Sequence, residues 1–223
     1  MPDATGHRDR LKTRFTEGGG TGLADYELLE LALTYAIPRK DVKPIAKELL
    51  KRFESLSGVL TAPAEELARI GGMGPHSATF LTLIHQMALR TQRRSLAEKP
   101  VFTNRVLLMD YLYTLFAGKT REELHVLYVD AKLALIKDET VFKGTLTATS
   151  ASPRDIIKRA LELNAAGLII THNHPSGTPT PSDADHTFTT QLANLCPAME
   201  LALHDHLIIG ADRHYSFKGA GEL

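Results

Sequence analysis

The spacing of the apolar residues changes near residue 100, and this change limits the folds open to the chain. From Asp25 to Arg90 they recur at helical intervals of three and four. Glycines and prolines interrupt this stretch repeatedly, which predicts several short helices. The segment from Gln92 to Pro100 is polar, lacks periodicity and ends in proline, so we expect a linker there. The sequence therefore predicts two domains, residues 1–96 and 101–223.

After the expected linker, short β-prone runs alternate with helical patterns. Thr103 is expected to cap a short helix that extends through Leu112. Strands are predicted at residues 124–129, 133–136, 141–148, 168–171 and 203–210. The run Ser152-Pro153-Arg154-Asp155 is typical of a capping box and predicts a helix ending near Gly167, and a second helix is expected at 181–194. The predicted fold class is α/β (α+β), with a small all-helical domain followed by a mixed-sheet domain.

Composition excludes several classes of protein. Of 223 residues, 43% are hydrophobic and 23% charged, which argues against disorder. Lys plus Arg and Asp plus Glu each total 26, so a dedicated DNA coat protein is not expected. The single cysteine, Cys196, excludes an intrachain disulfide and is expected to be a small buried hydrophobe. The polar start from Met1 to Arg10 and the absence of a long apolar run predict a cytoplasmic protein without a membrane span.

Candidate metal ligands lie in the segment Thr171-His172-Asn173-His174, followed by Ser182 and Asp185. Residues two apart on a strand point to the same face, so His172 and His174 can present two imidazoles to one ion. Asp185, in the first turn of the next helix, would add a carboxylate. Two histidines and one aspartate leave an open position on a tetrahedral zinc ion, which is how catalytic zinc sites are built. The alternatives are a surface loop and, for Ser182 and Asp185 alone, an ordinary helix capping box.

These residues resemble the JAMM/MPN metalloproteases, whose pattern is an upstream Glu, then His-x-His, seven residues, Ser, two residues and Asp. His172, His174, Ser182 and Asp185 match that spacing without a gap. Further segments are similar to the bacterial RadC family, and with the helical part they cover nearly the whole chain. They are Phe142 to Leu146, Pro153-Arg154-Asp155, His172 to Gly177 and Asp205 to Gly210.

The resemblance implies a set of roles. His172, His174 and Asp185 would hold one Zn²⁺ per chain, and Ser182 would orient the substrate carbonyl oxygen or stabilise the tetrahedral intermediate. The general base would be Glu122, because the family places it two residues before the apolar residue that opens a strand, here Leu124.

Glu123 is the adjacent competitor for that role. Strand alternation sends the two side chains to opposite faces, so only one of them can serve. The family pattern favours Glu122.

Other metal and nucleophile chemistries fit less well. A zinc deaminase is disfavoured because one cysteine cannot supply Pro-Cys-x-x-Cys, and the letters His-Asn-His do not define an HNH nuclease. His204 and His206 repeat the same-face spacing, but histidines on a β-prone run are more often satisfied sheet residues than ligands. No base is indicated beside Cys196, which argues against a nucleophilic cysteine.

In the helical part, Gly72, Met73 and Gly74 resemble the turn of a helix-hairpin-helix motif, in which backbone amides meet a nucleic-acid phosphate. Ser77 stands where the family often has a lysine, which removes a phosphate contact. Weak, non-specific DNA binding is one expectation. A purely structural or protein-binding turn is the other.

The preferred hypothesis is a zinc-dependent hydrolase that cleaves a peptide or isopeptide bond in a protein or peptide substrate. The alternative is a DNA-binding accessory protein of repair or replication with a non-catalytic metal domain. A third is a scaffold with an unused metal site. The presence of Glu122 and Ser182 together with the three ligands argues against it, because an unused site would be free to lose its base. Neither the substrate nor the oligomeric state follows from the sequence.

Overall fold

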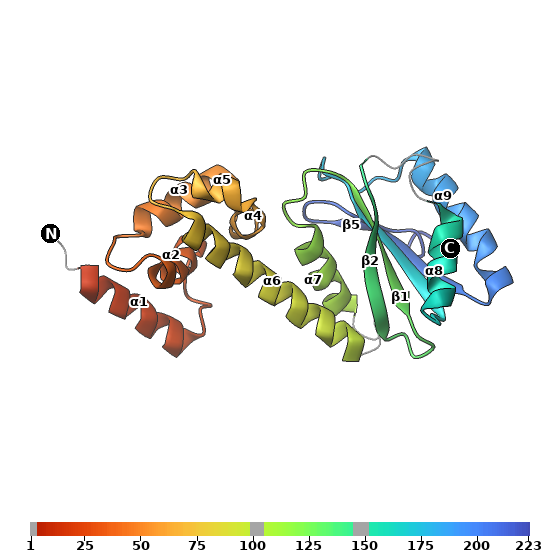
Figure 1. The fold of residues 1–223 in the computed structure, drawn as a ribbon, viewed down its shortest axis with the longest axis horizontal. Helices are drawn as coiled ribbons and strands as arrows, with labels where there is room; N and C mark the ends of the chain where they lie inside the picture. Colours follow the sequence, from red (N-terminus) through yellow and green to blue (C-terminus); the bar gives the residue numbers. More distant parts are fainter. Residues whose placement is uncertain (1–3, 99–104, 145–151) are drawn as a thin grey trace. The chain divides into compact units, whose positions relative to one another are not determined.

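The computed structural model describes residues 4–98, 105–144 and 152–223. The chain divides into two compact units, Met1–Ala88 and Leu89–Leu223. The first is helical, and the second contains a five-stranded mixed sheet with helices (Figure 1). The predicted α/β class and the order of a helical part before a mixed sheet are confirmed. No helix in the described ranges is long and apolar enough to cross a membrane.

The first unit is built from short helices, as the interrupted periodicity predicts. They are α1 (Ala4–Gly18), α2 (Asp25–Ala36), α3 (Lys43–Phe53), α4 (Leu56–Thr61), α5 (Ala64–Ala68) and the beginning of α6 (Pro75–Glu98). Helices α2 to α6 share one apolar core, in which Leu33, Leu49, Leu67 and Leu81 are fully buried. The helical spacing thus marks the residues that face this core.

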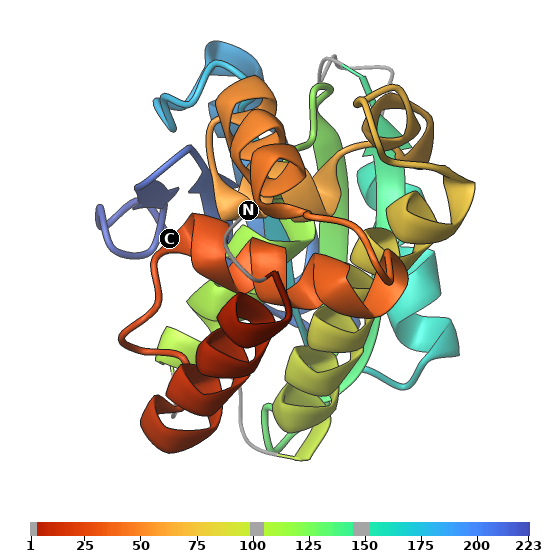
Figure 2. The ribbon, with the colours of Figure 1, turned by 90° about the vertical axis from the view of Figure 1, so that its left-hand side faces the viewer.

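The first helix was not expected from the periodicity, because α1 is largely charged. It nevertheless buries Leu11, which packs with Leu23, just before α2, and with Leu31 of α2. Figure 2 shows α1 beside α2. Gly19 and Gly20 follow the helix with φ of 60° and 85°, a conformation that glycine adopts without strain. The largely exposed helix is therefore held by one buried leucine together with the pairs His7–Glu30 and Arg14–Glu27, which join it to α2.

The expected linker at Gln92 to Pro100 is wrong for its described part, because α6 continues through Glu98. Leu96 is 1% exposed and packs into the core of the second unit. Arg93 pairs with Asp138, and Arg94 with Glu98 one turn later. The polar residues of this segment occupy the outer faces of a helix and do not break it.

The sheet of the second unit has the order β2-β1-β3-β4-β5. Its strands are β1 (Glu123–Val129), β2 (Leu135–Lys143), β3 (Gly167–Asn173), β4 (Ala202–Ile209) and β5 (His214–Ser216). The β3–β4 pair is parallel and the other pairs are antiparallel, so the sheet is mixed as predicted. A parallel pair needs a crossover, which here contains α9 (Asp183–Leu195).

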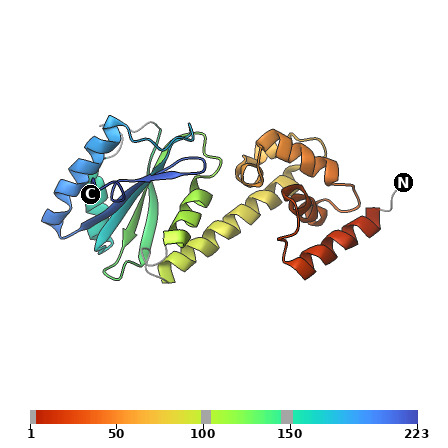
Figure 3. The same cartoon turned by 180° about the vertical axis from the view of Figure 1, so that it is seen from behind.

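Helices cover both faces of this sheet, as Figures 1 and 3 show. On one face, α7 (Arg105–Phe116) and the end of α6 pack against residues such as Leu127 and Ile169. On the other face, α8 (Pro153–Glu162) and α9 pack against Leu124 and Ile170. Both central strands, β1 and β3, are buried throughout, which is usual for strands covered on two sides. Cys196 lies in the second of these cores, which confirms that it is a small buried hydrophobe.

Two strand predictions were wrong in their bounds. The runs at 133–136 and 141–148 belong, within the described residues, to the single strand β2, and residues 145–148 lie outside those residues. The strand continues through the charged residues between the two runs because β2 is an edge strand, where Asp138 pairs with Arg93 of α6 and Glu139 with Arg159 of α8. Thr103, the residue expected to cap α7, also lies outside the described residues.

The capping box at Ser152 was also wrong, although α8 begins at Pro153 as predicted. The Ser152 side chain makes no capping hydrogen bond, because the amide of Asp155 donates to the Ser152 backbone carbonyl instead, at 3.0 Å. The helix ends at Glu162, earlier than predicted, since Asn164 turns the chain with φ of 50° and Gly167 already begins β3.

Candidate metal centre

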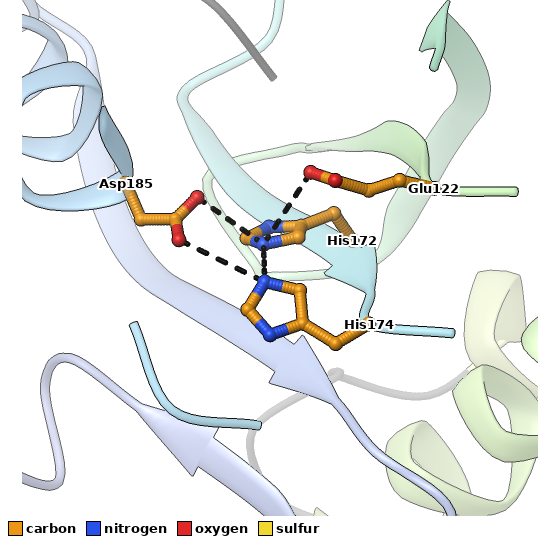
Figure 4. Close-up of side chains that lie close together, drawn as sticks. All are labelled: Glu122, His172, His174 and Asp185. Atoms are coloured by element: carbon orange, nitrogen blue, oxygen red, sulfur yellow. Dashed lines mark hydrogen bonds and ion pairs between the residues drawn. The ribbon is translucent and has the colours of Figure 1, made fainter. Parts of the chain in front are cut away.

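Two histidines stand on one face at the end of β3. The Nε2 atoms of His172 and His174 lie 3.0 Å apart, as the two-residue spacing on a strand predicts (Figure 4). His172 is fully buried and the side chain of His174 is 18% exposed. The pair therefore has one member inside the protein and one at the surface.

Asp185 reaches the histidines from the first turn of α9. Its Oδ1 atom lies 3.2 Å from Nε2 of His172, and its Oδ2 atom 3.8 Å from Nε2 of His174 (Figure 4). Ser182 is the N-cap of this helix, and the capping box expected for Ser182 and Asp185 is present. The Ser182 amide and hydroxyl both donate to Oδ2 of Asp185 at 2.7 Å. The box thus engages one carboxylate oxygen and leaves the other facing His172.

Glu122 completes the cluster from the residue before β1. Its Oε1 atom lies 4.0 Å from Nε2 of His172. Glu123 is turned elsewhere and pairs with Lys119, Lys143 and His125 at 3.1, 3.3 and 3.3 Å. The structure thus brings Glu122, and not Glu123, to the histidines.

Asn173, between the two histidines, points away from the cluster and holds the segment that carries Glu122. Its Oδ1 accepts from the Glu123 amide at 2.9 Å, and its Nδ2 donates to the Arg121 carbonyl at 3.1 Å. The sequence analysis gave Asn173 no role. Strand alternation contained the signal, because it places the middle residue of His-Asn-His on the opposite face.

The second pair of strand histidines does not form another cluster. His206 lies behind His172, with its Nε2 atom 2.9 Å from His172 Nδ1. In the described parts of the chain one group could hold a metal, and it consists of Glu122, His172, His174 and Asp185. One ligand atom from each of these residues lies within 4.8 Å of the others.

The chemistry of this group fits a divalent cation. Burial lowers the pKa of His172 to about 4, and burial also lowers the pKa of His206 well below its usual value. Both rings are therefore neutral at pH 7 and can offer a lone pair. Asp185 Oδ1 is buried without a hydrogen-bond partner, which is costly unless a positive charge satisfies it. Two imidazoles and one or two carboxylates are the ligands that zinc takes.

The predicted hairpin residues Gly72, Met73 and Gly74 belong to the first unit and are not part of this cluster. Gly72 has φ of 89°, a conformation that other residues rarely adopt, and a Cβ there would lie 2.8 Å from Cδ1 of Ile45, so a substitution would strain the turn. Ser77 is buried and exchanges two hydrogen bonds with the Gly74 backbone. The Lys40 ammonium lies beside Gly72 and places a cation at this turn.

The mixed sheet carries, at the end of β3, two histidines, an aspartate and a glutamate that could hold a metal ion. This arrangement is consistent with a JAB-type domain, and comparisons with known proteins agree. Residues 102–222 match the RadC-like JAB domain, and residues 4–79 match the UPF0758 N-terminal family. A UPF0758 protein of Ruegeria pomeroyi is 46% identical over 217 residues, which is 97% of each chain. The chain belongs to the RadC family.

Proposed function

We propose that this protein is a zinc-dependent hydrolase of the JAMM type that cleaves a peptide or isopeptide bond. The observation that carries the proposal is the convergence of Glu122, His172, His174 and Asp185, with Asp185 Oδ1 buried and lacking a donor. Membership of a family with a JAB domain supports the same chemistry.

His172, His174 and Asp185 would hold the ion through Nε2, Nε2 and Oδ1. A zinc ion bound there supplies Lewis acidity, which lowers the pKa of water towards ~7 and polarises a carbonyl oxygen. The residues around it keep the ligands in place, because Ser182 holds Oδ2 of Asp185. The hydroxyl proton of Ser182 is directed at that oxygen, and a role for Ser182 towards the substrate carbonyl stays a prediction.

Glu122 would act first as the general base and then as the general acid. Its side chain is 16% exposed and lies at the edge of the cluster, within reach of both His172 and solvent. In hydrolysis its carboxylate would accept a proton from the attacking water as the water oxygen bonds to the carbonyl carbon. It would then pass that proton to the nitrogen that leaves when the carbon–nitrogen bond breaks.

The test is a screen of peptide and isopeptide libraries with the zinc-loaded protein, followed by the Glu122→Gln variant. Because Glu122 acts on the proton and is not needed to hold the ion, the variant should keep its zinc content and melting temperature. Hydrolysis should fall by about 10²–10⁴-fold. Glu123→Gln is the matched control and should change turnover far less.

Two results would contradict this assignment. Full turnover by Glu122→Gln would show that another group accepts the proton. Loss of zinc from the variant would place Glu122 among the ligands.

A second candidate function is weak DNA binding by the first unit. The observation that favours it is the Lys40 ammonium beside Gly72, which supplies a cation at the turn where Ser77 cannot. The backbone amides at the start of α6 would add donors for a phosphate. This binding would localise the hydrolase and not replace it.

A further inference from the structure

We propose that His206 and Thr189 are positioning residues that fix the ring tautomer of His172, so that its Nε2 lone pair faces the metal site. The proposal rests on the metal site of the proposed function. His206 and Thr189 are both buried and lie behind His172, outside the group of four residues that could hold the metal.

A chain of three short contacts starts at the back of His172. His172 Nδ1 lies 2.9 Å from His206 Nε2, and His206 Nδ1 lies 2.6 Å from the Thr189 hydroxyl oxygen. That oxygen lies 2.6 Å from the backbone carbonyl oxygen of Asp185. The chain therefore begins on β3, passes through β4 and ends on α9, at the residue that also supplies the carboxylate.

Only one direction of proton donation makes all three contacts hydrogen bonds. The Asp185 carbonyl can only accept, so the Thr189 hydroxyl must donate to it. The hydroxyl has a single proton, so His206 Nδ1 must donate to Thr189. His206 Nε2 then carries the lone pair and accepts from His172 Nδ1. The reverse direction would leave two oxygen atoms facing each other at 2.6 Å in a buried place.

This direction leaves the Nε2 atom of His172 without a proton. His174 reaches the same state independently, because its Nδ1 lies 3.0 Å from the Thr178 carbonyl, which can only accept. Two nitrogen lone pairs and the unpartnered Oδ1 of Asp185 therefore converge. Such an arrangement is repulsive by itself and is satisfied by a cation.

Without this chain of hydrogen bonds, the metal-free protein would favour the other neutral tautomer of His172. The other neutral tautomer carries its proton on Nε2 and can donate it to His174 Nε2 at 3.0 Å. That hydrogen bond would occupy both ligand atoms and close the site. The chain opposes this outcome by requiring the proton of His172 on Nδ1.

The packing around His206 keeps the chain in place. The ring is fully buried and stacks on Phe217, with centroids 4.9 Å apart and an interplanar angle of 8°. Phe188 of α9 meets it edge-on at 6.3 Å. Because the ring is fully buried and packed against both phenylalanines, its two nitrogens stay directed at His172 and Thr189.

The first test is nitrogen-15 NMR of the metal-free protein, which distinguishes protonated from unprotonated ring nitrogens. The His172 signals are assigned from the spectrum of His172→Gln. The proposal expects the proton on Nδ1 in the wild-type protein. A proton on Nε2 would overturn it.

The second test uses Thr189→Val, which keeps the side-chain shape and removes the hydroxyl, with Thr189→Ser as the matched control. In Thr189→Val the His172 proton should move towards Nε2, and zinc affinity measured by chelator competition should fall by about 10–100-fold. Thr189→Ser should restore both properties to near wild type. A purely structural role would lower the melting temperature of Thr189→Val but leave the tautomer unchanged.

The outcomes separate this proposal from the proposed function. Unchanged zinc affinity and tautomer in Thr189→Val would overturn the positioning role. If Thr189→Val does not fold, the other two proteins decide the question. A proton on Nε2 of His172 in the wild type overturns the proposal, and a proton on Nδ1 in both the wild type and Thr189→Ser, whose hydroxyl is kept, supports it. A wild-type protein with the proton on Nδ1 that takes up no zinc would contradict the metal site and support the tautomer assignment.

Discussion

Replacing Asp185 by asparagine is expected to abolish zinc binding and yet stabilise the metal-free protein. The carboxylate is 1% exposed, and its Oδ1 atom has no donor while facing the Nε2 atom of His172 at 3.2 Å. An asparagine can keep its oxygen towards Ser182 and place its NH₂ group at the Oδ1 position. That group would donate to the His172 lone pair, so a repulsive contact becomes a hydrogen bond.

The magnitude follows from opposing contributions. Relief of a buried acceptor without a donor is worth about 1–3 kcal/mol, and the new hydrogen bond about 0.5–1.5 kcal/mol. Against this, the two bonds from Ser182 lose their ionic partner, about 1 kcal/mol each. The helix dipole loses a favourable charge in the first turn of α9, about 0.3–1 kcal/mol. With each contribution at the middle of its range, the gains exceed the losses by roughly 0.4 kcal/mol, so the metal-free variant is expected to be at least as stable as wild type.

Zinc should make the wild-type protein more stable than Asp185→Asn. At a free zinc concentration of about 100 times its dissociation constant, wild type gains about 2.7 kcal/mol and the variant nothing. Urea denaturation with chelator and then with zinc measures both values. Asp183→Asn is the control, because it removes a charge from the same helical turn on an exposed side chain and should keep the full gain from zinc. The reasoning is refuted if Asp185→Asn is less stable than wild type with chelator, or gains as much from zinc.

Two further predictions concern other parts of the chain. The full chain should bind a short DNA duplex weakly, without sequence preference and with a shallow salt dependence, and Lys40→Gln should weaken this binding several-fold; no binding at low salt would contradict the phosphate site. Hydrogen bonds from Arg159 hold the pKa of Glu139 below its usual value. A carboxylate whose pKa folding lowers contributes stability above its usual pKa and loses it as the pH falls through the lowered value. Glu139→Gln should therefore cost about 0.2–1 kcal/mol in urea denaturation at neutral pH and progressively less as the pH falls through the lowered pKa of Glu139, and a cost independent of pH would be contrary evidence.

Periodicity predicted those elements whose apolar residues face a single core. The strand β3 and the helix α9 were found within two residues of their ends, because Ile169, Ile170 and Leu192 are buried as their spacing requires. Helix α1, the end of α6 and the full length of β2 were missed, since each keeps its place with one or two buried residues among many charges. In those segments tertiary contacts outweigh local composition, as Leu11 and Leu96 show.

The candidate metal ligands could be predicted from the sequence, whereas the residues that hold those ligands in place could not. His172, His174 and Asp185 carry their spacing in the sequence, and the strand and helix that hold them translate it directly into space. Thr189 and Asn173 carry no such pattern. Their contacts depend on which strands become neighbours, and the order β2-β1-β3-β4-β5 is not written in any local window.

The position of Asn173 has a consequence for anyone who wishes to transfer this site to another protein. The tripeptide His-Asn-His sends two imidazoles to one face of β3 and a carboxamide to the other, where it binds the backbone on both sides of Glu122. A transplant of the four clustered side chains alone would leave the glutamate on an untethered strand end. The smallest portable unit is therefore the two paired strands, the asparagine that joins them and the first turn of α9 that carries Asp185, so a host must offer an antiparallel neighbour in this register as well as a helix start beside it.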